Sequence, residues 1–165
     1  MLEWGYDDFE PTEQSCRLMR DSGVNYIVCP GTNTWNSVTG RTATMINNIK
    51  TAAANGLKYG ACGILCTDWG DNGHHQPLCV SYPGIVWAAA NSWNCADSHA
   101  ADIPVILDRL IFSDKSGKMG QIVLDAGNYR EAEYKQPINI TFTMHLMLSD
   151  FGDPKIIENA AAADF

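Results

Sequence analysis

The feature that most constrains this chain is the alternation of short apolar segments with helix-like stretches over its first two-thirds. Residues 2–6, 24–29 and 61–67 are short runs bounded by turn-forming residues, which is typical of β-strands. Apolar residues at helical spacing occupy the intervals between these runs. Strands that alternate with helices of this length form parallel β-α-β units, so the pattern predicts an α/β fold.

Proline and glycine residues indicate where the helices between these strands begin and end. Pro11 suits the first turn of a helix, and Gly23 suits its C-terminal cap. The second helix is marked by four apolar residues at helical spacing, namely Ala43, Ile46, Ile49 and Ala53. Gly56 is expected to close that helix. The segment 61–67 that follows is nearly all apolar, as expected for a strand covered on both faces of a parallel sheet.

The remainder of the chain is expected to be helical. Helices are predicted over four runs, Tyr82 to Trp93, Ile103 to Phe112, Met119 to Glu133 and Thr141 to Leu148. Residues 159–165 are expected to form a frayed helix or tail. The chain is therefore divided into a β/α region, residues 1–95, and a helical C-terminal extension, residues 96–165.

Composition and charge narrow the classes of partner. The net charge of −8, with no cluster of Lys and Arg, argues against nucleic acid. No apolar run reaches the roughly 18 residues of a membrane span, and no signal peptide is visible, which favours a cytoplasmic location. The six cysteines could form three disulfides, but their apolar surroundings favour free thiols. The oligomeric state stays open.

Each predicted strand ends in aromatic and polar residues. In a parallel β/α fold these strand ends meet on one face, so three tryptophans should converge there. Tryptophan rings bind the apolar face of a pyranose, while carboxylates and amides hold its hydroxyls. The candidate substrate-binding residues are Trp4, Tyr6, Asn33, Trp35, Trp69 and Asp71. The alternative is that the tryptophans only pack loops onto the sheet.

Two aspartates of the third strand end have different expected roles. Asp71 lies two positions after Trp69, so on an extended backbone the two side chains share a face. A carboxylate beside a stacking ring can accept hydrogen bonds from two hydroxyls, although Asp71 could instead cap the following loop. Asp68 points the other way and is expected to be structural, paired with Arg41 or a backbone donor.

The histidine and cysteine residues near this strand end invite a metal interpretation. His74 and His75 follow Cys66 and precede Cys79, but this spacing does not fit a zinc site. The chain also lacks a phosphate-binding glycine loop and a redox Cys-x-x-Cys pair. We therefore expect no metal and no cofactor.

Three motifs in this order carry a resemblance to a known family. They are Glu3 to Tyr6 (Glu-Trp-Gly-Tyr), Cys29 to Ser37, and Thr67 to His74. Together they resemble the C-terminal part of the catalytic barrel of glycoside hydrolase family 20, the β-N-acetylhexosaminidases, in a bacterial branch. The resemblance covers about residues 1–93. It implies the last three β/α units of a (β/α)8 TIM barrel, followed by C-terminal helices, and hence a fragment.

The resemblance implies an activity whose catalytic pair this chain lacks. The family removes terminal N-acetylhexosamine residues by a substrate-assisted retaining mechanism, in which an Asp-Glu pair orients the acetamide and transfers the proton. No Asp-Glu dipeptide occurs here, and the one adjacent acidic pair is Asp7-Asp8. We therefore assign no catalytic residue and expect the chain alone to be inactive.

The family also places a Trp-x-Glu element at its eighth strand, where it holds the sugar. Trp69-Gly-Asp71 resembles that element, with Asp in place of Glu, and Trp4 and Trp35 resemble two further walls of the pocket. Two alternatives remain. One is a non-catalytic carbohydrate-binding module that uses the three tryptophans. The other is a two-carboxylate glycosidase that uses Asp68 or Asp71.

Overall fold

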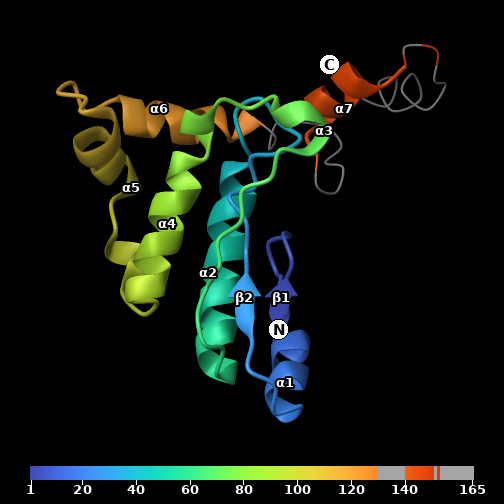
Figure 1. The fold of residues 1–165 in the computed structure, drawn as a ribbon. Helices are drawn as coiled ribbons and strands as arrows, with labels where there is room; N and C mark the ends of the chain where they lie inside the picture. The colour runs from blue at the N-terminus through green and yellow to red at the C-terminus, as the bar shows by residue number, and fades with distance from the viewer. Residues whose placement is uncertain (130–139, 151, 153–165) are drawn as a thin grey trace.

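The computed structural model describes residues 1–129, 140–150 and 152. Helices dominate it, and α1 and α2 lie beside a small parallel sheet (Figure 1). In chain order the elements are β1 (Leu2–Trp4), α1 (Glu13–Asp21), β2 (Ile27–Cys29), α2 (Thr42–Tyr59), α3 (Asp71–His74), the 3-10 turn η1 (Leu78–Val80), α4 (Tyr82–Trp93), the 3-10 turn η2 (Ser98–Ala100), α5 (Ile103–Ile106), the π-helix η3 (Leu107–Phe112), α6 (Met119–Ala126) and α7 (Phe142–Leu148). The predicted α/β class is confirmed.

The sheet is parallel, as the alternation of strands and helices predicts. β1 and β2 pair in register, with Leu2 opposite Ile27 and Trp4 opposite Cys29. The predicted third strand, 61–67, runs along the other side of β2, where its residues form isolated parallel bridges to Val28 and Gly31. The backbone N–H of residue 65 donates to the carbonyl of Val28 at 2.9 Å. The third segment is thus extended and parallel, but its ladder is interrupted.

Helices cover one face of this sheet. A small core of Cys16, Tyr26, Val28 and Ala52 joins α1 and α2 to β2, and Ile64 packs against it. On the opposite face Leu2 and Leu65 are 54% and 47% exposed. The expectation that segment 61–67 is covered on both faces is therefore not met within the described residues, because alternate side chains along it meet a helix layer and an open cavity.

α2 connects this sheet layer to the C-terminal helices. Its Met45 and Ile49 enter a second core, which contains Trp87 of α4 and Leu107 and Leu124 further along the chain. Figure 1 shows α4 lying beside α2, with α5 and α6 gathered at the same side. This core crosses the predicted boundary at residue 95, so the helical extension packs directly on the β/α region.

The ends of the first helix differ slightly from the prediction. Pro11 precedes the helix instead of entering its first turn, and Thr12 is the N-cap, whose hydroxyl accepts from the backbone N–H of Ser15 at 3.1 Å. Gly23 follows the last helical turn with φ of +71°, the left-handed conformation expected of a helix-terminating glycine.

The prediction that Gly56 closes the second helix is wrong. α2 continues to Tyr59 and ends at Gly60, which has φ of +77°. Gly56 sits within the helix where it faces the sheet, and a Cβ there would lie 3.0 Å from a methyl group of Val28. Its lack of a side chain therefore serves close helix–strand packing.

Three of the four helices predicted for the second half of the chain agree with the described residues, and the fourth is shorter than predicted. The run Tyr82–Trp93 is α4, and the run from Thr141 corresponds to α7. The predicted helix 103–112 is present, but its second half is the π-helix η3. The predicted helix 119–133 is too long, because α6 ends at Ala126 with Gly127 as its C-cap. Residues 130–133 and the predicted tail 159–165 lie outside the described residues. Within the described part of the chain, no helix has the length and apolar character needed to cross a membrane.

Candidate functional site, an aromatic cavity at the strand ends

A cavity of about 520 Å³ lies on the uncovered face of the sheet, toward the C-terminal ends of the strands. We call it the aromatic cavity. It is lined by Leu2, Trp4, Tyr6, Cys29, Trp35, Leu65, Thr67, Trp69 and Asp71. Five of the six candidate substrate-binding residues are in this set, and Asn33 is not. The fold therefore brings together side chains that come from three separate segments of the chain.

Tyr6 is the centre of the aromatic cluster. Its ring stacks on that of Trp4, with centroids 5.7 Å apart, and meets the rings of Trp35 and Trp69 edge-on at 4.9 Å and 6.4 Å. The Nε1–H of Trp69 also donates to the Tyr6 hydroxyl at 2.8 Å. The expected convergence of the three tryptophans thus occurs through contacts with one tyrosine.

The three tryptophans differ in how much surface they offer. Trp4 is 67% exposed and Trp69 is 47% exposed, whereas Trp35 is 1% exposed. The Arg41 guanidinium lies 5.1 Å from the centre of the Trp35 ring system, a distance suited to a cation–π contact. Trp35 is therefore a buried ring that packs against Tyr6. Trp4 and Trp69 carry the ring surface that a ligand could stack against.

Asp71 is the carboxylate of the cavity. It begins the short helix α3, and its Oδ2 accepts from the amide of Asn36 at 3.4 Å. Asn36 in turn accepts from the amide of Asn72 at 2.7 Å. Asn36 and Asn72 both have positive φ, a conformation that asparagine tolerates better than most residues. Asp71 thus accepts a hydrogen bond from Asn36, which is itself bonded to Asn72. Neither asparagine was among the candidates.

Asp68 has the structural role expected of it, with different partners. Its Oδ1 accepts hydrogen bonds from the hydroxyls of Thr32, Thr34 and Ser81, at 2.5, 2.9 and 3.0 Å. These hydroxyls take the place of the guanidinium or backbone donor that the sequence suggested. Asp68 therefore joins the segment that carries Trp69 to the loop that carries Trp35 and to the start of α4.

Asn33 lies beneath the cavity instead of in its wall. Its side chain is fully buried, and its amide donates to the carbonyl of Gly31 at 3.2 Å and to Asn48 Oδ1 at 3.4 Å. A positive φ of 56° turns the backbone at this position. The structure thus places Asn33 in the packing of the loop after β2, away from any ligand in the cavity.

Four residues that line the cavity were not among the candidates: Leu2, Cys29, Leu65 and Thr67. We call the first three the floor of the cavity. Burial raises the pKa of the Cys29 thiol, which keeps it protonated and uncharged at neutral pH. The floor is therefore apolar, while Asp71 stands in the wall. The period-two alternation of strands could have identified Leu2, because it shares a face with Trp4.

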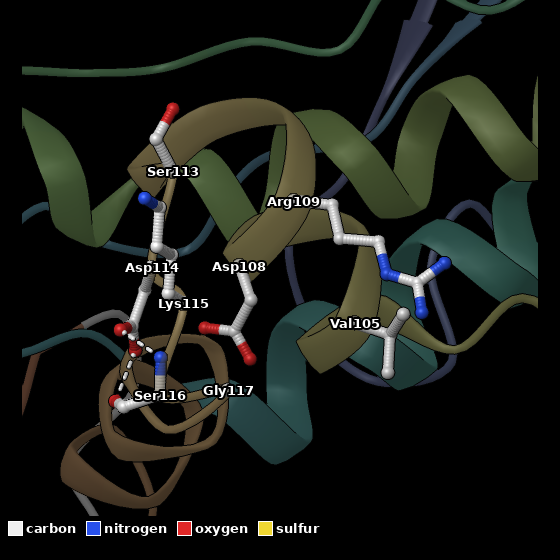
Figure 2. A pocket seen from close by; sticks show the side chains of 8 residues that line it. All are labelled: Val105, Asp108, Arg109, Ser113, Asp114, Lys115, Ser116 and Gly117. Atoms are coloured by element: carbon white, nitrogen blue, oxygen red, sulfur yellow. Dashed lines mark hydrogen bonds between the residues drawn. The ribbon is translucent and has the colours of Figure 1, made fainter.

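A second cavity, of about 510 Å³, lies at the junction of η3 and α6 (Figure 2). Asp114 is one of its lining residues. Hydrogen bonds from the backbone N–H groups of Lys118, Met119 and Ser116 hold the pKa of the Asp114 carboxyl well below the usual range. Figure 2 shows its hydrogen bonds to Ser116, while Arg109 extends away from them.

The buried Asp108 accepts from the backbone N–H of Gly120 at 2.7 Å. The carboxylates of Asp108 and Asp114 cap the N-terminus of α6, which accounts for their presence.

The described residues contain no group of three or more His, Cys, Asp or Glu side chains that could hold a metal ion. His74 and His75, which invited that interpretation, lie in and just after α3. Comparison of the chain with models of protein families, with curated proteins and with solved structures found no match.

Proposed function

We propose that the aromatic cavity binds a carbohydrate of the N-acetylhexosamine class. The observation that carries this proposal is that two exposed indole rings, those of Trp4 and Trp69, each contact Tyr6 and line one cavity with the Asp71 carboxylate. Aromatic faces attract the C–H face of a pyranose, and a carboxylate accepts hydrogen bonds from its hydroxyls.

The size and floor of the cavity fit this ligand class. A volume of about 520 Å³ falls within the range of small-molecule sites in proteins. The apolar floor of Leu2, Cys29 and Leu65 offers a place for the methyl group of an N-acetyl substituent. The hydroxyls of the same sugar would then face Asp71 and Thr67 at the wall.

We further propose that these residues are part of a larger glycoside hydrolase of the family 20 type, built on a (β/α)8 barrel. Three parallel segments, each followed by residues of one cavity, support this proposal. Within the described residues the outer edges of β1 and of segment 61–67 have no strand partner, and further strands could pair there. The acid/base chemistry would belong to those additional strands.

The second candidate is a non-catalytic carbohydrate-binding module, and the exposure of Trp4 and Trp69 supports it equally. The coding region that precedes Met1 distinguishes the two. An in-frame sequence with further β/α units and an Asp-Glu pair supports the hydrolase, whereas its absence leaves the binding module.

Titration with N-acetylglucosamine, followed by tryptophan fluorescence, tests the binding proposal. We expect a saturable change at millimolar sugar that is lost in Trp69→Ala. Trp93→Ala is the matched control, because Trp93 is 92% exposed and does not line the cavity. An unchanged titration in Trp69→Ala would contradict the proposal. Hydrolysis of a nitrophenyl N-acetylglucosaminide by the purified chain would contradict the expectation that it is inactive alone.

A further inference from the structure

Asn48 of α2 makes an unusual number of side-chain hydrogen bonds for a fully buried residue. Its Nδ2 lies 2.9 Å from each of three carbonyl oxygens, those of Gly5, Asp7 and Glu10. Its Oδ1 accepts from the backbone N–H of Gly31 at 3.0 Å. One amide side chain thus contacts four backbone groups. Of these, the Asp7 carbonyl also accepts from the backbone N–H of Glu10 at 3.0 Å.

These partners belong to the two loops that build the centre of the aromatic cavity. The carbonyls come from the loop after β1, which carries Tyr6, and the N–H comes from the loop after β2, which carries Trp35. The first loop is closed on itself by Glu10, whose carboxylate accepts from the backbone N–H of Tyr6 at 3.0 Å. Asn48 is the side chain that joins this closed loop to the second one.

The chemistry of the position calls for a primary amide. Three carbonyls share the two N–H bonds of the Asn48 amide, and the N–H of Gly31 requires an acceptor. Aspartate would supply the acceptor but place negative charge against the carbonyls, and an apolar side chain would remove all of these hydrogen bonds. The position therefore selects for a residue that has both functions in one planar group.

We propose that Asn48 is a positioning residue for the aromatic cavity, which fixes Tyr6 relative to Trp35 without touching a ligand. The 4.9 Å edge-on contact between these two rings is the geometry that it would hold. The consequence for sugar binding rests on the proposed function, whereas the consequence for ring geometry does not.

The test compares Asn48→Ala and Asn48→Asp with Asn55→Ala. Asn55 is a matched control, because it is also a buried asparagine of α2 and donates to the carbonyl of Pro11 at 2.8 Å. Near-ultraviolet circular dichroism reports the packing of the aromatic cluster, far-ultraviolet circular dichroism reports helix content, and fluorescence titration with N-acetylglucosamine reports binding.

We expect both Asn48 variants to keep the far-ultraviolet spectrum and to lose much of the near-ultraviolet signal, while Asn55→Ala keeps both. Where the wild-type chain binds the sugar, the Kd should rise about tenfold in the Asn48 variants. A wild-type near-ultraviolet spectrum in either Asn48 variant would overturn the proposal. Loss of helix content in both Asn48 variants would also overturn it, because Asn48 would then support the whole fold. Failure of the wild-type chain to bind sugar would count against the proposed function alone.

Discussion

The indole N–H of Trp69 donates a 2.8 Å hydrogen bond to the hydroxyl of Tyr6, which lies 63 residues earlier in the chain. This bond orients two rings that form one side of the aromatic cavity. We predict that Tyr6→Phe keeps the ring contacts, frees the Trp69 indole and weakens sugar binding by about 1 kcal/mol. The Trp69 indole proton resonance and a sugar titration measure these two effects.

Tyr59→Phe is the control for this substitution. It also removes one hydroxyl hydrogen bond, that of Tyr59 to Glu13 at 2.9 Å, but on the exposed surface between α1 and α2. Sugar binding should not change in it. Equal binding by Tyr6→Phe and the wild-type chain would show that the bond has no part in the site.

Replacement of Asp68 and replacement of Asp71 should have different effects, the first on stability and the second on sugar binding. Asp68→Ala leaves three hydroxyls of the loop and α4 without their shared acceptor, so we expect a loss of stability of roughly 1–3 kcal/mol. Asp71→Ala should change stability by less than about 0.5 kcal/mol but weaken sugar binding, because Asp71 lines the cavity. Urea unfolding and fluorescence titration measure the two quantities. A loss of stability in Asp71→Ala with a loss of sugar binding alone in Asp68→Ala would contradict this prediction.

Gly31 is predicted to tolerate no side chain. A Cβ there would meet the Trp35 ring and lie 3.0 Å from Cδ1 of Tyr6. We expect Gly31→Ala to cost about 1–3 kcal/mol through overpacking and to disturb the near-ultraviolet spectrum of the cluster. Gly63→Ala is the control, since a Cβ there meets nothing within 4 Å. If both variants unfold at the same urea concentration, the packing around Trp35 is not as described.

The thiols should differ in reactivity. Burial, with a smaller contribution from the charge of Asp68, raises the pKa of Cys66 to about 12. A raised acid pKa keeps the neutral form dominant below it, and the thiolate is the nucleophile, so Cys66 should react slowly at pH 8. The exposed Cys62 and Cys79 should be modified first by a thiol reagent. Mass spectrometry of peptides after timed labelling measures the order, and early modification of Cys66 would contradict it.

The sequence was sufficient to predict features that depend on local pattern. The first two strands, α4 and the convergence of Trp4, Trp35 and Trp69 follow from apolar runs, helical spacing and the geometry of parallel strand ends. Tyr6 and Asp71 could be identified for the same reason, because they follow the strands within a few residues.

Features that depend on the exact path of the loops and the packing of individual side chains could not be predicted. Gly56 resembles a helix terminator in sequence, yet its role is set by the approach of Val28. Asn33 was a candidate because it follows a strand, and Asn48 has no distinguishing sequence signal. The path of the loops makes both of them buried supports. The burial of Trp35 beneath Tyr6 likewise depends on how two loops meet.

We propose that Trp4, Trp35 and Trp69 bind sugar in one cavity with Tyr6, and the indole N–H resonances of the five tryptophans test this proposal most directly. On addition of N-acetylglucosamine to the ¹⁵N-labelled chain, we predict saturable shifts for these three tryptophans. Trp87, buried in the second core, and the exposed Trp93 serve as internal references and should not move. Shifts of all five resonances to a similar extent, or of none at high millimolar sugar, would contradict the proposal that the aromatic cavity binds sugar.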